Sequence, residues 1–128
     1  MKKLIVFIFS VLLLVSCESN VDKVVRKTAE ELNKSCPMFV DKITRLDKVE
    51  IDEDGYFHYT YTFPTLTIND INASNFKDEQ FKILNKMYNT NEKFDIYRQN
   101  NIYLKYTYFD KNNQEIVTLT INDLYEYR

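Results

Sequence analysis

The sequence of 128 residues is poor in the residue types that metal and phosphate sites require: it holds one histidine, two cysteines and one glycine. A structural zinc site takes four cysteine or histidine ligands, which these residues cannot supply. A loop that cradles phosphate needs several glycines, and Gly55 stands alone. The acidic run of residues 52–54 lacks the alternating oxygen ligands and the late glutamate of a calcium loop. We therefore predict neither a metal site nor a cofactor.

The same scarcity bears on catalysis, because nucleophilic catalysis needs a nucleophile, a base and an orienting group close together. His58 could act as a base, with Cys36 or a serine as the nucleophile. However, Cys36 continues the apolar face of a predicted helix, whereas His58 lies mid-strand on the face opposite the predicted core. We assign no catalytic residue and predict that the protein is not an enzyme, with a small hydrolase as the least favoured alternative.

The N-terminal apolar run is short. Met1-Lys2-Lys3 gives a positively charged start to the apolar residues 4–15. Twelve helical residues rise roughly 18 Å, which is well short of the ~30 Å hydrocarbon core of a bilayer. A charged start, a short apolar middle and a small residue before a cut point indicate a secretory signal peptide.

Leu14-Val15-Ser16-Cys17, at the end of this run, resembles the lipobox of bacterial lipoproteins. The resemblance implies that residues 1–16 are a lipoprotein signal peptide, removed before Cys17, and that acyl chains such as palmitate are attached to that cysteine. Residues 17–20 would then form the lipidated cysteine and a short tether. Two or more acyl chains bind a membrane stably, whereas one binds it marginally. We expect a lipid-anchored protein of the bacterial cell envelope, on the periplasmic or external side of a membrane.

Residues 21–128 are enough for a single domain with a hydrophobic core. Without Lys2 and Lys3, 15 basic residues face 19 acidic ones, and this net charge near −4 argues against nucleic acid as a partner. If Cys17 carries lipid, Cys36 is the only remaining thiol and cannot form an intramolecular disulfide. It is then either buried or available for an intermolecular bond.

The hydrophobic pattern of this domain alternates between helical and strand periods. The predicted elements are a helix over 21–36, strands over 45–51 and 56–63, a helix over 75–89, a loop over 89–99, and a hairpin with strands near 102–108 and 117–121. Asp54-Gly55 marks the first hairpin turn, and residues 110–113 mark the second. This order predicts an α+β fold of two αββ units, which form one antiparallel sheet with two helices packed on one face.

The domain also resembles a group of small bacterial envelope lipoproteins to which no activity is assigned. The resemblance rests on Glu31-Leu32-Asn33, Cys36-Pro37, Val40-Asp41, Thr44-Arg45-Leu46 and Tyr59-Thr60-Tyr61. It implies a location in the envelope and carries no catalytic or binding residue over to this chain.

If both helices cover one face of the sheet, the other face is free to bind a partner. Strand alternation places six residues there as a candidate binding surface: Tyr56, His58, Thr60, Tyr103, Lys105 and Phe109. Tyrosines interleaved with polar side chains are typical of recognition surfaces, although cross-strand aromatic pairs on a solvated face give the same pattern.

These observations predict a membrane-anchored, non-catalytic binding or accessory module. An inhibitor or immunity protein is a special case of it. The membrane is contacted through the acyl chains on Cys17, and the further partner is a protein, a peptide or a glycan. The alternative is a structural or assembly factor of an envelope complex.

Overall fold

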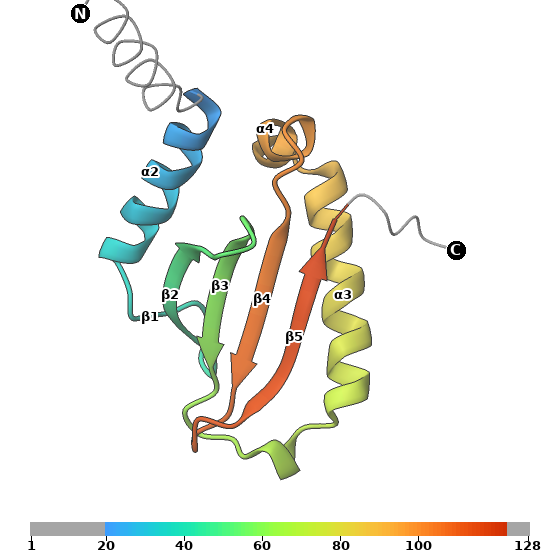
Figure 1. Cartoon of the computed structure of the whole chain (residues 1–128). Coiled ribbons are helices and arrows are strands. Elements are labelled where there is room, and N and C mark those ends of the chain that lie inside the picture. The colour runs from blue at the N-terminus through green and yellow to red at the C-terminus, as the bar shows by residue number, and fades with distance from the viewer. Residues whose placement is uncertain (1–19, 123–128) are drawn as a thin grey trace, which may run out of the picture.

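A computed structural model describes residues 20–122 of the chain. Its elements, in chain order, are α2 (Asn20–Lys34), β1 (Met38–Phe39), β2 (Arg45–Ile51), β3 (Phe57–Thr62), α3 (Ala73–Thr90), α4 (Asp95–Gln99), β4 (Leu104–Phe109) and β5 (Glu115–Ile121) (Figure 1). The predicted signal peptide and Cys17 lie outside the described residues. Within residues 20–122, no helix has both the length and the hydropathy that crossing a membrane requires.

The five strands form one sheet in the order β1-β2-β3-β4-β5. The pairs β2–β3 and β4–β5 are antiparallel hairpins, which confirms the α+β class and the repeated helix–strand–strand order. One seam differs from the expected antiparallel sheet, because β3 and β4 run parallel. The reason is that α3 returns the chain along the length of the sheet before β4 begins (Figure 1), and parallel neighbours require such a crossover.

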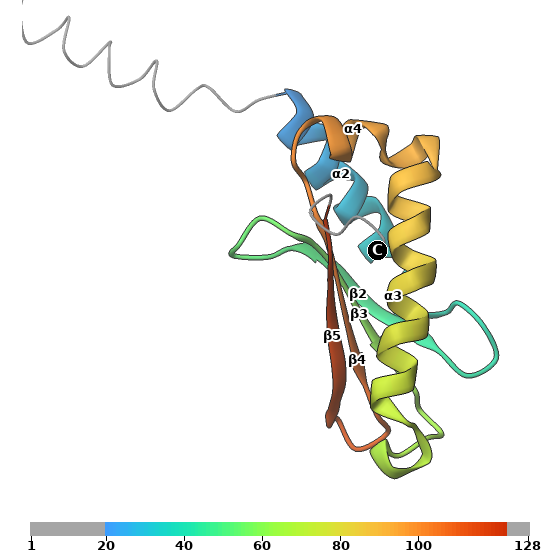
Figure 2. The same cartoon turned by 90° about the vertical axis from the view of Figure 1, so that its right-hand side faces the viewer.

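Both long helices lie on the same face of the sheet (Figure 2), as the sequence predicts. α2 packs against β2, and α3 packs against β5. Val25 and Ala29 of α2 and Leu84 and Tyr88 of α3 join the apolar side chains of the strands in one core. Phe57 of β3 is fully buried there. Burying a side chain of this size contributes roughly 1.5–3 kcal/mol relative to leaving it exposed.

The segment between α3 and β4 is not the predicted loop. Glu92–Phe94 forms a 3-10 turn that leads directly into α4. Asn91 starts the turn, because its side chain accepts a hydrogen bond from the backbone N–H of Lys93. Tyr97 of α4 is buried and meets Phe57 edge-on, with ring centroids 5.6 Å apart. The hydrophobic pattern missed α4 because so short a helix does not show a helical period.

A buried carboxylate joins the second hairpin turn to the segment that leads into α3. Asp110 has no exposed surface. Its carboxylate accepts hydrogen bonds from the backbone N–H groups of Ile68 (2.9 Å), Asn112 (2.8 Å) and Gln114 (2.9 Å). Desolvation acts to raise the pKa of this carboxyl, but the backbone hydrogen bonds hold the pKa below its ordinary value. The contact with Ile68 therefore ties the β4–β5 hairpin to the chain before α3.

Candidate functional site

Strand alternation turns the predicted binding surface away from the two helices. Phe57 and Leu104 enter the core, so their neighbours His58 and Lys105 lie on the opposite face, side by side in the register of β3 and β4. Thr60 lies on the same face but is only 8% exposed, so little of its side chain is open to a partner.

The aromatic residues of this face lie in two places. The rings of Tyr56 and Tyr103 are 6.2 Å apart, and the Nζ of Lys105 lies 4.4 Å from the centre of the Tyr56 ring, in a cation–π contact. Phe109 lies four residues beyond Lys105 on β4, roughly 13 Å away at the rise of a strand. The structure therefore gathers Tyr56, His58, Tyr103 and Lys105 at one end of the face and leaves Phe109 at the other.

An acidic side chain from the β2–β3 turn joins this group. The Asp52 carboxylate lies 3.1 Å from the Nζ of Lys105 and 3.5 Å from the Nδ1 of His58. It also accepts hydrogen bonds from the backbone N–H groups of Asp54 and Tyr56. Burial acts to raise the pKa of Asp52, but Lys105 and these backbone groups hold it below its ordinary value, and the same hydrogen bond raises the pKa of Lys105. The charges of this face are thus paired with one another.

His58 continues the network into the sheet. Its Nε2 lies 2.8 Å from the Oγ1 of Thr107, which lies 3.1 Å from the Oγ1 of Thr118. Desolvation lowers the pKa of His58, while Asp52 acts against the shift and Lys105 adds to it, so the ring is neutral at neutral pH. The Thr118 hydroxyl donates to the Glu115 carboxylate at 3.2 Å, so it accepts from Thr107, and Thr107 in turn accepts from the protonated Nε2 of His58.

A carboxylate, an imidazole and a hydroxyl in this order are also the groups of a catalytic triad. The Thr107 side chain, however, is 5% exposed and hydrogen-bonded on both sides, so a substrate cannot approach its oxygen. Cys36 packs against the core after α2, where its Sγ donates to the Leu32 carbonyl at 3.4 Å, and it does not meet His58. Within the described residues, no group of three or more His, Cys, Asp or Glu side chains could hold a metal ion. We interpret Asp52, His58 and Thr107 as a structural network.

The sheet face that the helices cover carries four stacked tyrosines. From the sequence, these side chains are predicted only to be part of the core. Tyr59 and Tyr61 of β3 lie beside Tyr106 and Tyr108 of β4 in the parallel register. The ring centroids are 4.8 Å apart in the Tyr59–Tyr106 pair and 5.1 Å apart in the Tyr61–Tyr108 pair, and both pairs are stacked. We call these four residues the tyrosine row.

The hydroxyl groups of the tyrosine row have no hydrogen-bond partner among residues 20–122. No buried side-chain oxygen in this part of the chain lacks a partner, so the four hydroxyls reach the accessible surface. Burial raises the pKa of all four residues, and it raises the pKa of Tyr61 to about 12 with the Cys36 thiol adding to the shift. The row therefore stays protonated and presents hydroxyls that can each donate and accept.

A hollow of about 330 Å³ opens at one end of the tyrosine row, between α3 and the loop that joins β1 to β2. Tyr61 and Tyr108 line it from the sheet, and Gln80 and Leu84 line it from α3. The loop completes the lining with Val40, Asp41, Ile43 and Thr44. The combination of apolar walls with a few polar groups is typical of binding sites.

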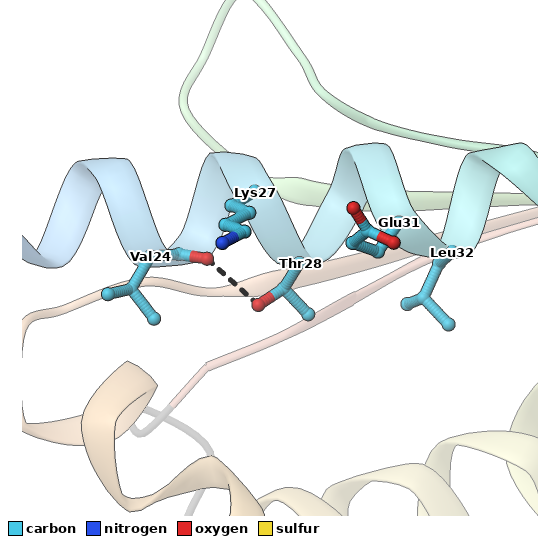
Figure 3. Close-up of a pocket in the computed structure, with 5 residues that line it drawn as sticks. All are labelled: Val24, Lys27, Thr28, Glu31 and Leu32. Atoms are coloured by element: carbon cyan, nitrogen blue, oxygen red, sulfur yellow. Dashed lines mark hydrogen bonds between the residues drawn. The ribbon is translucent and has the colours of Figure 1, made fainter.

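A second hollow, of about 430 Å³, lies along α2. Val24, Thr28 and Leu32 project from α2 toward the side on which α3 and α4 lie, and Lys27 and Glu31 complete the lining (Figure 3). The Thr28 hydroxyl donates to the Val24 carbonyl of its own helix at 2.8 Å, which leaves the hollow lined mainly by apolar groups.

Three of the large apolar side chains that reach solvent line these hollows. Those with the greatest exposure among the described residues, each at least 48% exposed, are Val24, Phe39, Val40, Ile43 and Ile83. Val24 lines the second hollow, and Val40 and Ile43 line the first. Ile83 lies next to Leu84 on α3. We call the tyrosine row with Val24, Val40, Ile43 and Ile83 the interhelical surface. Grouped apolar residues of this kind mark interaction sites, whereas scattered ones do not.

Sequence reasoning missed the interhelical surface because it placed these side chains in the core or in a connector. One signal was present. Each long helix carries two adjacent apolar residues, Val24-Val25 and Ile83-Leu84, which point about 100° apart on a helix. Only Val25 and Leu84 are buried, so the second member of each pair is left on the surface.

Comparison with known proteins places this geometry in context. A family model described as "Domain of unknown function (DUF8479)" matches residues 19–118. A protein of Pseudomonas aeruginosa that is described as secreted has the same fold, with 14% identity and a TM-score of 0.61 over 83% of this chain and 96% of that one. The pilotin of the type 2 secretion system of Vibrio vulnificus also has this fold. Its sequence is 9% identical, and the TM-score is 0.60 over 80% of this chain and 87% of the pilotin. No curated protein sequence matches.

Proposed function

The chain belongs to the DUF8479 family, and on that premise we propose that it is a lipid-anchored, non-catalytic module of the bacterial cell envelope. Its role is to bind a protein partner through the interhelical surface. The observation that carries the proposal is that exposed apolar side chains line two hollows, one at the end of the tyrosine row and one along α2. Covering apolar area stabilises a complex by roughly 25 cal/mol per Å² before the entropy of association is subtracted.

The stacking of the tyrosine row supports a protein partner over a glycan. Sugars are held on the faces of aromatic rings, but the faces of Tyr59 and Tyr106 are turned toward each other, 4.8 Å between centroids. On the opposite sheet face, Lys105 already lies over the Tyr56 ring. Ring edges, hydroxyls and aliphatic side chains remain, and these suit the apolar side chains and backbone groups of a polypeptide.

A lipid anchor at Cys17 fits the placement of this surface. Two residues separate Cys17 from the start of α2 at Asn20, a reach of roughly 10 Å. The anchor would hold α2, and with it the second hollow, close to the membrane and would raise the effective concentration of the module toward other envelope proteins.

Two kinds of partner are compatible with such a module. A fold shared with a secretion-system pilotin supports an assembly role, in which the partner is a membrane protein of a larger complex. An inhibitor or immunity role is the second possibility, in which the partner is a soluble toxin or lytic enzyme. The solubility and identity of the captured partner separate the two.

A crosslinking pull-down from intact cells tests the proposal with four forms of the chain: wild type, Cys17→Ala, Ile43→Ser/Ile83→Ser and Tyr56→Ala/Tyr103→Ala. Ile43 and Ile83 are largely exposed, so their replacement leaves the core intact. We expect one partner that wild type captures and that the Ile43→Ser/Ile83→Ser form loses, with the tyrosine double variant as the control. Loss of the partner only from the tyrosine variant moves the site to the opposite sheet face. The absence of any enriched protein refutes the binding role.

A further inference from the structure

Among residues 20–122, β5 is the last strand of the sheet and pairs on one side only. The direction of the backbone groups alternates along a strand, and the Phe57 N–H donates to the Tyr103 carbonyl across the β3–β4 seam. The backbone N–H and C=O groups of Tyr103, and of every second residue after it along β4, therefore point toward β3. Thr118 and Thr120 lie opposite these residues, so their backbone N–H and C=O groups point away from β4. Within residues 20–122, no hydrogen bond reaches these four groups.

The other edge of the sheet is closed. β1 pairs with Arg45 and Leu46 at one end of β2, and the Asn33 side chain of α2 accepts a hydrogen bond from the Val49 N–H at 3.1 Å. Four of the seven side chains of β2 are charged, and charge on an edge strand opposes pairing with a further strand. β5 carries one charged side chain, that of Glu115 at its first position.

α3 leaves the edge of β5 open. The helix packs on the core side of the strand, and in Figure 2, where this edge faces the viewer, β5 lies in front with α3 beside it rather than across it. After a register shift at its start, β5 pairs regularly with β4 from Val117 to Ile121. Leu119 faces the core, and Thr118 and Thr120 face the opposite side.

We propose that the β5 edge binds an extended segment of the protein partner, which adds a sixth strand to the sheet. This inference rests on the proposed function, because it states how the partner is held. The edge offers donors and acceptors that repeat every two residues, about 6.8 Å apart, and an extended backbone presents the complementary groups at the same spacing. The segment has no proline at its bonded positions, because proline has no N–H to donate.

A second copy of this chain does not fit the same edge. α3 lies on the core face of the sheet and extends beyond β5 along the length of the strand (Figures 1 and 2). Two copies paired through β5 would hold these strands about 4.8 Å apart. Their two α3 helices would then overlap, because packed helices need roughly 8–10 Å between their axes. A single extended segment brings no helix with it.

Photo-crosslinking in intact cells tests the proposal with the full-length chain. p-Benzoylphenylalanine replaces Thr120 in the test chain and Glu50, on the closed edge strand β2, in the control. The Thr120 probe is then combined with Thr118→Pro or with Thr118→Val. Both substitutions remove the Thr118 hydroxyl, but only proline removes the outward N–H, which β4 does not use.

We expect the Thr120 probe to join the partner captured by wild type through one stretch of its sequence, and the Glu50 probe to miss it. Thr118→Pro should lower the crosslinked yield about tenfold relative to Thr118→Val, the effect of losing one hydrogen bond at an interface. Melting temperatures of both variants check their folding. If the proline variant does not fold, amide hydrogen exchange of the wild-type chain decides: the Thr118 and Thr120 amides should be protected in the complex and exchange rapidly without it.

Equal yields from Thr118→Pro and Thr118→Val, or unprotected amides at both threonines in the complex, overturn the β5 inference while the proposed function stands. Crosslinks from the Thr120 probe to a second copy of this chain overturn it in favour of a dimer. If wild type captures no partner, both proposals fail together.

Discussion

Tyr88 of α3 gives the sharpest test of how the core is held. Its side chain has no exposed surface, and its hydroxyl donates to the Ile102 carbonyl at 2.9 Å. In a Tyr88→Phe variant the ring remains, but the Ile102 carbonyl loses the hydrogen bond that the Tyr88 hydroxyl donates. Removing one hydrogen bond within a folded protein costs about 0.5–1.5 kcal/mol. We expect the free energy of unfolding to fall by about 1 kcal/mol and the melting temperature by about 5 °C.

Tyr59→Phe is the matched control, because it removes the same atom from a hydroxyl that has no partner among the described residues. Its free energy of unfolding should stay within about 0.5 kcal/mol of wild type. Urea unfolding followed by circular dichroism measures both variants, and the slope with denaturant should be unchanged if the folded states are equally compact. A Tyr88→Phe variant that is no less stable than Tyr59→Phe would refute the assignment of a stabilising hydrogen bond to Tyr88.

Three further predictions concern the turns and the pH dependence of stability. Gly55 has a φ of +85° and no atom within 4 Å of an added Cβ, so Gly55→Ala should lower the unfolding free energy in urea by about 1 kcal/mol through backbone strain alone; an unchanged value contradicts this. The folded-state pKa of Asp110 is depressed, so its stabilisation is present above the unfolded pKa and is lost as the pH falls through the folded one. Asp110→Asn should therefore melt lower than wild type at pH 7, and the difference should shrink below about pH 4. The folded-state pKa of His58 is also depressed, so protonation favours the unfolded chain and wild type loses stability as the pH falls below 6.5. Melting temperatures of His58→Gln between pH 7 and 5 should lack that loss, and parallel curves for the two proteins contradict the assignment.

Much of the fold could be predicted because single residues decide local conformations. Gly55 permits the tight turn between β2 and β3, and Pro37 stops α2, which ends at Lys34. The alternation that begins at Phe57 sets the core face of β3. The parallel seam could not be predicted in this way, because apolar alternation is the same in parallel and antiparallel neighbours. What decides the direction of β4 is the path of α3 across the sheet, which is a tertiary property.

The candidate site was predictable to the extent that strand register determines it. Register alone brings His58 beside Lys105. The pairing of both with Asp52 depends on how the turn folds back over the sheet, and no pattern of residues indicated it. A helical period likewise does not show that Ile83 is exposed while its neighbour Leu84 is buried. The lipidation of Cys17 lies outside the described residues and stays a prediction.

The parallel pairing of β3 with β4 also governs the order in which the sheet forms. Each hairpin closes a short turn and can form on a time scale of about 1–10 μs. The seam instead requires the closure of roughly forty residues that include all of α3. We therefore expect the two hairpins to form before the seam that joins them, and the closure of this long loop to slow folding. Before that step the inner edges of β3 and β4 are bare and prone to aggregate. A proteolytic cut within α3 would accordingly release two aggregation-prone hairpins rather than a smaller folded domain.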